Sequence, residues 1–145
     1  MIQNIIDLVI ENEKLKREAE NYNLGNLIDD LEKYPKDANV EITPFCLYPT
    51  GLTSYRGYYS DLAITYSDSG KTLNCGELLN ICKKAVGKNF YGYKGGEFKM
   101  SRKTVVWLAP YGRTTGVVLT GVKDCFGDGS YLELTWKNTE RSDGV

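Results

Sequence analysis

The residues best suited to hold a ligand lie between Lys88 and Arg113, in the segment KNFYGYKGGEFKMSRKTVVWLAPYGR. This segment combines aromatic rings, glycines and cationic side chains. Aromatic rings give nucleobases a face on which to stack. Glycines let the backbone approach a ligand closely, and arginines bind phosphates through a rigid fork of donors. The segment is therefore a candidate site for an anionic ligand that contains a ring.

Side chains of three kinds make up the candidate ligand-binding set. The rings that could stack on an adenine are those of Phe90, Tyr93 and Trp107. The amide of Asn89 could read a base edge or a ribose hydroxyl. The cations that could bind phosphates are Arg56, Lys94, Arg102 and Arg113. For the three rings the alternative is a position in the hydrophobic core, and for Lys94 it is a solvated hairpin tip.

The charge of the chain is unevenly distributed. The net charge is −1. Residues 1–45 carry ten acidic and five basic side chains, whereas residues 83–113 carry eight basic and one acidic. An anionic partner at the basic segment is one reading, and a solvated lysine-rich surface is the other. The overall acidity disfavours DNA as a partner, because DNA-binding proteins usually present an extended basic face.

Several kinds of catalysis lack their usual residues. The chain has no histidine, which removes the commonest general base and metal ligand and every Ser-His or Cys-His nucleophile. The glycines at 92, 95 and 96 match neither a phosphate-binding loop nor a dinucleotide fingerprint. Carboxylates near the basic segment are few, and Asp124 and Asp128 flank a glycine turn. We expect a protein that binds without catalysis and needs no cofactor or metal.

The length of 145 residues is that of one domain with a core of its own. No long apolar run predicts a membrane span, and the N-terminus lacks the pattern of a signal peptide. The cysteines do not form a C-x-x-C pair, and they are expected to be buried free thiols rather than disulfides or zinc ligands. They are Cys46, Cys75, Cys82 and Cys125. The expected location is therefore the cytoplasm.

Two helices are expected to open the chain. Residues 4–21 are expected to form the first helix. One apolar stripe consists of Ile2, Ile5, Ile6 and Val9, and Leu15, Ala19 and Tyr22 extend it less regularly. This stripe could pack on its own domain or be shared across a dimer. A second helix, LIDDLEKY, can be capped by Asn23 or Asn26 and ends at Pro35.

The rest of the chain is read mainly as strands. Strands are expected around Val40 and at Leu62–Tyr66, VVWL, VVLTGV and YLELTW, and TGLTSYRGYYSD is expected to be a loop or tight turn. CGELLNICKKAV is a helix that begins with a capping box, Asn74 with Glu77, and stops at Gly87. NFYGYKGGEF is expected to be a wide hairpin or a loop between strands. The fold class is α+β: N-terminal helices, a mainly antiparallel β-sheet and one further helix.

The whole chain, residues 1–145, is expected to form a single domain. Residues 1–36 would be its helical N-terminal segment, residues 37–137 its α+β core, and residues 138–145 a polar tail.

Two runs, PTGLTSYRGYYSDLAI (49–64) and GELLNICKKAVGKNFYGYKGGEFKMSRKTVVWLAPYGR (76–113), carry a family resemblance. They resemble small phage proteins, the first-described anti-defence proteins against the bacterial Thoeris system. The similarity covers most of residues 37–123. The runs S-Y-R-G-Y-Y-S-D-L-A and F-x-G-Y-K-G-G-E are its most distinctive parts.

The resemblance implies a sponge rather than an enzyme. Such proteins bind a cyclic ADP-ribose isomer, glycocyclic ADP-ribose, and hold it intact, so that the Thoeris effector stays inactive in the host bacterial cytoplasm. The resemblance implies a homodimer or a dimer-based higher oligomer with ligand sites near the subunit interface, and in some members separate sites for cyclic oligonucleotides. The matching candidates are Phe90, Asn89, Arg102 and Arg113, followed by Arg56 and Lys94.

Two other functions stay open on the sequence. The amphipathic N-terminal helices and the eleven tyrosines favour a protein–protein inhibitor or interaction module, because tyrosine is common at interfaces. The second of these functions is that of an enzyme that cleaves a nucleotide signal. Such an enzyme would need a carboxylate, lysine or tyrosine as its general base. SYRGYY at 54–59 offers a second arginine-aromatic segment that could close the same pocket, from the same or a partner subunit.

Overall fold

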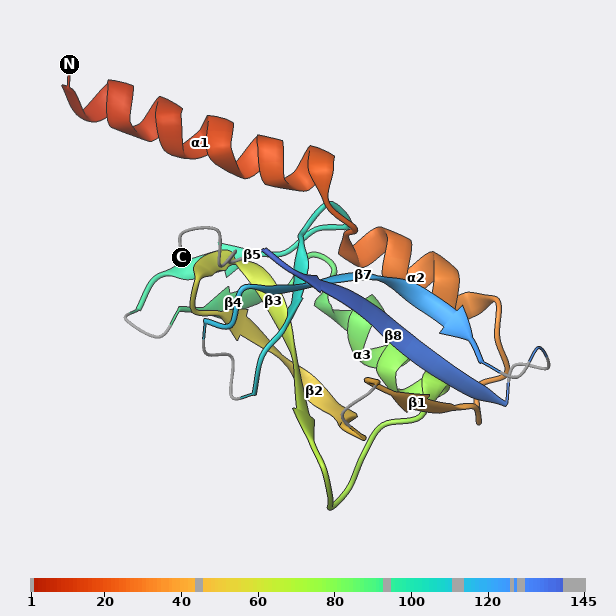
Figure 1. Cartoon of the computed structure of the whole chain (residues 1–145). Coiled ribbons are helices and arrows are strands. Elements are labelled where there is room, and N and C mark those ends of the chain that lie inside the picture. Colours follow the sequence, from red (N-terminus) through yellow and green to blue (C-terminus); the bar gives the residue numbers. More distant parts are fainter. Residues whose placement is uncertain are drawn as a thin grey trace.

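The computed structural model describes residues 2–43, 46–92, 95–110, 114–125, 127 and 130–139. Within these residues the chain forms helices and strands in the order shown in Figure 1. The helices are α1 (Ile2–Glu20), α2 (Leu24–Glu32) and α3 (Cys75–Ala85). The strands are β1 (Asn39–Glu41), β2 (Tyr48–Tyr55), β3 (Tyr58–Ser67), β4 (Asn89–Tyr91), β5 (Glu97–Lys99), β6 (Val106–Leu108), β7 (Val117–Asp124) and β8 (Tyr131–Asn138).

Six of the strands form one mixed sheet in the order β1-β8-β7-β6-β3-β2. β1 runs parallel to β8 and β3 runs parallel to β6, whereas the other neighbours in the sheet are antiparallel. β4 and β5 form a separate antiparallel ribbon, which is the hairpin expected from NFYGYKGGEF. The expected α+β class, with a mainly antiparallel sheet and one further helix, is confirmed.

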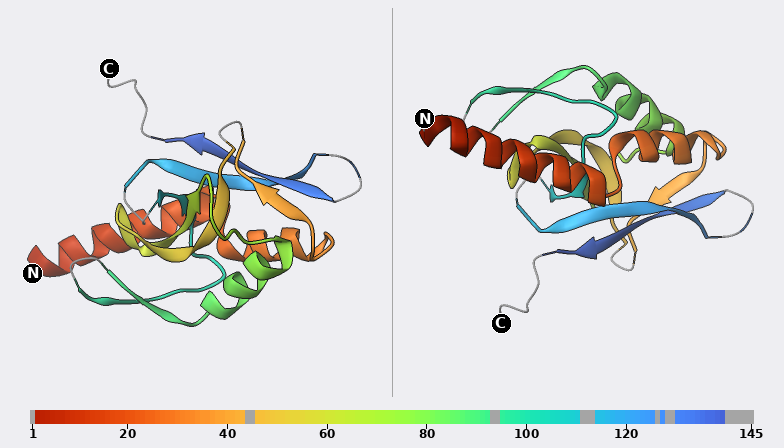
Figure 2. Two further views of the ribbon diagram at one scale, coloured as in Figure 1. Left: turned by 90° about the horizontal axis from the view of Figure 1, so that it is seen from below. Right: turned by 90° about the horizontal axis from the view of Figure 1, so that it is seen from above.

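α2 and α3 lie on the same side of the six-stranded sheet, and the main core lies between them and the strands (Figure 2). Leu27 and Leu31 of α2 and Leu78 and Cys82 of α3 are fully buried, because residues three or four apart lie on one side of a helix. They pack against alternate residues of the strands, namely Leu62, Ile64, Val106, Leu108, Leu119, Leu132 and Leu134.

A second, smaller core lies on the sheet face that α2 and α3 leave uncovered. Side chains alternate between faces along a strand, so Ala63 and Trp107 lie opposite to their neighbours in the main core. Trp107 is the register partner of Ala63, and the small alanine leaves room for the indole ring. The other members of this cluster are Tyr55, Val105, Ala109 and Val118.

Helices α2 and α3 both begin with a reciprocal capping box. In α2 the side chain of Asn23 accepts from the backbone N–H of Asn26, and the Asn26 side chain accepts from that of Asn23. Asn23 is therefore the cap, and α2 ends three residues before Pro35. In α3, Asn74 and Glu77 exchange the same two bonds, as the sequence predicts.

The segment TGLTSYRGYYSD was expected to be a loop or tight turn; it contains a tight turn but is mostly strand, so the loop alternative is wrong. It forms the end of β2 and the start of β3, which are joined by a turn at Arg56 and Gly57. Glycine, serine and threonine here favoured a loop, but tertiary pairing overrides that preference. Thr65 faces Gly51 across the hairpin, and Ser54 donates to the carbonyl of Tyr59, so the polar residues complete the ladder.

The C-terminal end of α1, which we call its root, is attached to the rest of the protein, and the remainder of the helix projects away from it (Figure 1). The exposed fractions of six aliphatic side chains on this helix lie between 45% and 63%; they are Ile5, Ile6, Leu8, Val9, Ile10 and Leu15. Ile5, Ile6, Val9 and Leu15 of the expected stripe therefore do not pack on their own domain, which was one of the two alternatives. Tyr22, at the end of the stripe, packs against the main core.

The four cysteines are free, as expected. Cys75 and Cys82 are buried, and burial raises the pKa of the Cys82 thiol to about 12. Cys46 is exposed and Cys125 is partly exposed, so the expectation that all four are buried is wrong. β8 extends to Asn138, one residue into the expected tail, and Thr139 donates to the carbonyl of Gly116. Among the described residues, no helix has the length and apolarity needed to cross a membrane.

The cap of α3 gives a test of the fold. Replacement of Asn74 by alanine removes the bond to the Glu77 N–H and should lower the free energy of unfolding by about 1 kcal/mol. Asn80→Ala, on an exposed position inside the same helix, should leave the stability unchanged or raise it. Urea unfolding of both variants measures this difference, and equal stabilities would contradict the role of the cap.

Candidate functional site

A buried carboxylate stands at the centre of the candidate site. Asp61 of β3 is fully buried. Its Oδ2 accepts a hydrogen bond of 2.9 Å from the indole Nε1 of Trp107 and one of 3.2 Å from Nε of Arg17. Within the described residues no donor reaches the other oxygen, Oδ1, although it is also buried. A buried polar atom without a partner is costly in free energy, so this carboxylate is not an ordinary core residue.

Arg17 joins α1 to this carboxylate and to an aromatic ring. Its guanidinium carbon lies 3.7 Å from the centre of the Tyr58 ring, in a cation–π contact. The ion pair with Asp61 is mostly shielded, because the Arg17 side chain is only 17% exposed. Removal of one partner from a buried ion pair typically costs about 3–5 kcal/mol. The root of α1 is therefore fixed to the sheet by a strong and specific contact.

Three aromatic rings cluster beside the carboxylate. The rings of Tyr55 and Trp107 are stacked, with centroids 4.5 Å apart and planes 2° from parallel. Tyr58 lies 5.9 Å from Trp107 and is tilted by 36°. The hydroxyl of Tyr55 accepts from the backbone N–H groups of Thr115 and Gly116. The stacked pair is thus held in place, whereas the Tyr58 ring is 43% exposed.

These rings line an open cavity of about 340 Å³, which we call the aromatic hollow. Its lining residues are Tyr55, Gly57, Tyr58, Trp107, Thr114, Gly116 and Thr139. Rings, threonine hydroxyls and glycine backbone are the groups that bind a base with its attached sugar. The aromatic hollow lies on the sheet face that carries the second core.

A second cavity of about 340 Å³, the root hollow, lies at the base of α1. Its lining residues are Ile10, Glu13, Lys14, Arg17, Tyr58, Tyr59, Ser60 and Phe98. Tyr58 belongs to both cavities, and Arg17 lies against its ring. The two hollows are thus neighbours on either side of one exposed ring.

Burial raises the pKa of Asp61 above its ordinary value of 3.8, while the hydrogen bond from Trp107 and the charge of Arg17 oppose that rise. The carboxylate therefore depends on its two donors to stay ionised. Arg17 in turn supplies a fixed cation beside Tyr58. Rings with a nearby cation can hold an anionic aromatic ligand by stacking and charge.

A larger cavity of about 480 Å³ lies elsewhere, where Asn39, Glu41, Tyr48, Glu77 and Tyr131 are among its lining residues. It carries two carboxylates and no cation among its lining residues. An anionic ligand would be repelled there. Of these two cavities, the aromatic hollow is therefore the better candidate site for an anionic ligand, despite its smaller volume.

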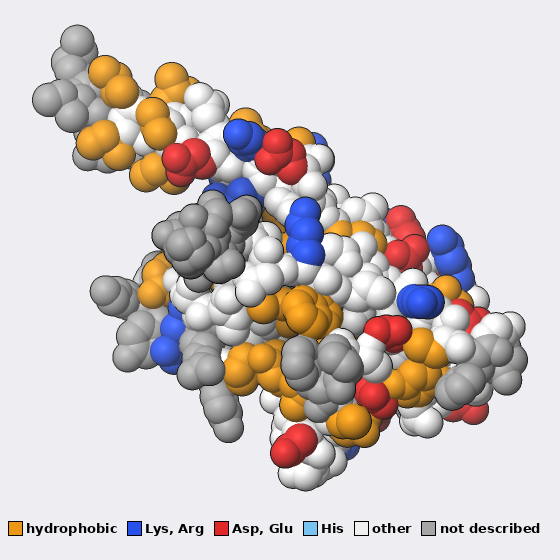
Figure 3. Space-filling model, viewed as in Figure 1, with side chains coloured by type: hydrophobic (Ala, Val, Ile, Leu, Met, Phe, Trp, Pro, Cys, Tyr) orange, Lys and Arg blue, Asp and Glu red, His pale blue; other side chains and the backbone are white. Residues whose placement is uncertain are grey.

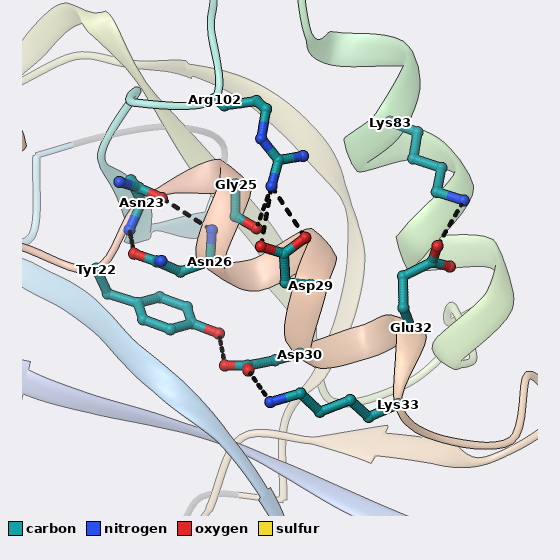
Figure 4. A network of polar contacts seen from close by, with 10 residues as sticks. All are labelled: Tyr22, Asn23, Gly25, Asn26, Asp29, Asp30, Glu32, Lys33, Lys83 and Arg102. Atoms are coloured by element: carbon teal, nitrogen blue, oxygen red, sulfur yellow. Dashed lines mark hydrogen bonds and ion pairs between the residues drawn. The ribbon is translucent and has the colours of Figure 1, made fainter.

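Arg102, one of the predicted residues, is engaged with α2 (Figure 4). Its Nη2 donates to both carboxylate oxygens of Asp29, at 2.9 and 3.0 Å, and to the carbonyl of Gly25. On the same helix Asp30 accepts from Tyr22, and Lys83 of α3 pairs with Glu32. Arg102 therefore holds the start of α2.

The structure places the other predicted residues in different parts of the fold. Trp107 is only 5% exposed, and among the described residues it alone of the predicted set lines the aromatic hollow. Phe90 packs against the main core from β4, next to exposed Asn89. Arg56 is exposed in the turn that precedes Gly57. The remaining three, Tyr93, Lys94 and Arg113, lie outside the described residues.

Asp61 and Arg17 were not among the residues predicted from the sequence, and Tyr55 and Tyr58 were expected to lie in a loop or tight turn. One signal was present, because Asp61 directly precedes the apolar run Leu62–Ile64 in an alternating strand. A charged residue inside a buried strand needs a partner. That partner comes from a helix 44 positions earlier in the chain, and no local pattern indicates such a contact.

Asp61 gives a pH test of this site. The pKa of Asp61 is higher in the folded chain than in the unfolded chain. At a pH between these two values the folded chain therefore keeps a proton that the unfolded chain has lost. The contribution of Asp61 to stability is greatest below pH 3.8 and falls as the pH rises through the folded pKa. The free energy of unfolding of the native chain minus that of Asp61→Asn should therefore decrease between about pH 4 and pH 7.

Urea unfolding across this range measures the difference. Asp68→Asn, which removes an exposed carboxylate beyond β3, is the control for loss of charge. A difference that stays flat or increases with pH would contradict the raised pKa.

Comparisons with protein-family models, curated proteins and solved structures give no match to this chain. The geometry alone therefore defines the candidate site. It consists of the exposed ring of Tyr58, the stacked rings of Tyr55 and Trp107, and the buried carboxylate of Asp61, which accepts hydrogen bonds from Trp107 and Arg17.

Proposed function

We propose that this chain binds a nucleotide signal of the cyclic ADP-ribose type and holds it intact, as an anti-defence sponge of the kind that the sequence resembles. The observation that carries the proposal is the aromatic hollow, in which the exposed Tyr58 stands beside the stacked Tyr55 and Trp107. The function is sequestration of the signal away from the effector that responds to it.

The size and chemistry of the aromatic hollow support such a ligand. A volume of about 340 Å³ falls within the range of roughly 300–1,000 Å³ that small-molecule sites occupy. The rings suit a purine, the hydroxyls of Thr114 and Thr139 suit a ribose, and Arg56 next to Gly57 is an exposed cation for a phosphate. The basic segment at residues 83–113 adds to the attraction for an anion.

Affinity without catalysis is sufficient for this function. Stacking contributes about 1–3 kcal/mol per base, and hydrogen bonds to charged groups contribute about 1.5–3 kcal/mol each. A few such contacts approach the roughly 12 kcal/mol that nanomolar binding requires. A sponge acts at a ratio near one to one with its ligand, so slow release matters more than turnover.

The proposal includes a cytoplasmic location, where the signal would be made, and self-association of the chain. Cyclic oligonucleotides at a separate site are part of the same proposal. The predicted residues Asn89, Phe90 and Arg102, together with the three that lie outside the described residues, stay candidates for ligand contacts. Nη2 of Arg102 is engaged by Asp29 and Gly25, so a phosphate would bind the other donors of the guanidinium or displace Asp29.

A second candidate is an inhibitor that acts by contact with another protein. The exposed aliphatic side chains along α1 favour it, because contiguous apolar surface on a small protein marks an interaction site. This function predicts binding to a protein target in the absence of any nucleotide.

The ligand test uses titration calorimetry of the full chain with cyclic ADP-ribose isomers, and with cyclic oligonucleotides for comparison. Tyr58→Ala removes the exposed ring and should raise the dissociation constant by about 10- to 100-fold. Tyr91→Ala is the matched control, because this exposed tyrosine of β4 is not among the residues that line the aromatic hollow. Phe90→Ala and Arg113→Ala test the residues predicted from sequence in the same assay.

A second measurement separates holding from cleavage. The chain is mixed with the nucleotide and heated until it unfolds, and the released nucleotide is then identified. Recovery of the intact nucleotide is the expected result. A new product in excess of protein would indicate an enzyme, and failure of the nucleotides to bind would contradict the proposal and favour the protein-inhibitor function.

A further inference from the structure

The exposed face of α1 carries a heptad pattern. The side chains at spacings of three and four are Ile5, Leu8, Asn12, Leu15 and Ala19. All five are exposed. In a heptad written abcdefg they occupy positions a, d, a, d and a, which form the seam of a coiled coil. Figure 3 shows the apolar side chains along the projecting part of this helix.

The opposite face of α1 is the one attached to the body. Arg17, at position f, binds Asp61 and covers Tyr58. Ile10, Glu13 and Lys14, at positions f, b and c, line the root hollow with it. Positions b, c and f lie on the side of a helix away from a and d. At the C-terminal end of α1 the side chain of Glu18, at position g, is only 11% exposed, so one margin of the seam is covered there. From Ile5 to Leu15 the seam residues are exposed, and another helix can approach them.

The residues of the seam and of its two margins indicate how many helices associate, in which direction and in which register. Isoleucine at a with leucine at d favours two parallel strands, and a single asparagine at a fixes the register. Glu11 is at position g and Lys16 at position e, and both are exposed. A parallel pair places g of one helix against e of the next heptad of the other, so Glu11 would meet Lys16 of the second copy twice by symmetry.

The alternatives are less favourable on the same residues. An antiparallel pair brings g positions against g positions, which would place Glu11 and Glu18 of two copies together. Neither Glu11 nor Lys16 forms an ion pair inside the described part of the chain, whereas Lys14 pairs with Glu18 and Arg17 with Asp61. Glu11 and Lys16, which form no ion pair within the described part of one copy, are thus the two charged residues that a parallel pair would bring together.

We propose that α1 joins two copies of this chain as a parallel, in-register coiled coil, with Asn12 facing Asn12 at its centre. A seam of two heptads is short, and an isolated peptide of that length is a marginal helix in water. Here the helix is anchored by the buried contact between Arg17 and Asp61. That contact lowers the ordering cost of association. The two bodies then lie on opposite outer sides of the pair, with both aromatic hollows near its root.

Charge reversal tests the pairing, with the mass of the full chain measured by sedimentation equilibrium as a function of concentration. The native chain should reach the mass of a dimer. Glu11→Lys and Lys16→Glu should each raise the dissociation constant by about tenfold, because each variant brings like charges together at two exposed contacts. An equimolar mixture of the two variants should recover native affinity, since the mixed dimer restores both opposite-charge pairs. Glu13→Lys, the same charge change at position b, should leave the dissociation constant unchanged.

Cysteine cross-linking tests the register. In a Cys46→Ser background, which removes the exposed native thiol, Asn12→Cys should form a disulfide between two copies under mild oxidation. Lys14→Cys, at position c, should not. A monomeric native chain at high concentration, a trimer or larger assembly, no recovery in the mixture, or equal cross-linking at positions 12 and 14 would each overturn the proposal.

Discussion

The buried ion pair between Arg17 and Asp61 is the constraint on which the arrangement of this protein depends. One carboxylate oxygen accepts from both Arg17 and Trp107, so a single atom joins α1 to β3 and β6. Its burial makes the carboxylate costly unless both donors are present. That requirement sets the position of the indole ring, the exit of α1 from the body and the location of the cation beside Tyr58.

This constraint also relates the two proposed activities of the molecule. On one side of Tyr58 lies the aromatic hollow, and on the other lies the root of α1. A ligand that stacks on Tyr58 would change the surroundings of Arg17, and association through α1 would restrict the same arginine. Sites on a rigid scaffold are more precise than sites on loops. Here the scaffold is a strand pair and a helix root rather than the basic glycine-rich segment.

Local chemistry explains why much of the fold could be predicted. Periods of 3.6 and 2 residues locate helices and strands, and Asn74 with Glu77 identifies the start of α3 because a capping box is a contact between near neighbours. Gly87 has a φ of +81°, which glycine tolerates best, at the end of that helix. The hairpin β2–β3 was misread because its glycines and hydroxyl side chains favour loops when strand pairing is not known.

The α+β class, the helix caps, the absence of histidine and the basic segment follow from the sequence alone, since each is a property of composition or of residues close in the chain. The folded arrangement was needed to show which rings share a cavity, that Asp61 pairs with Arg17, that Arg102 pairs with Asp29, and which face of α1 is exposed. These facts depend on contacts between residues tens of positions apart, and periodicity carries no information about such pairs.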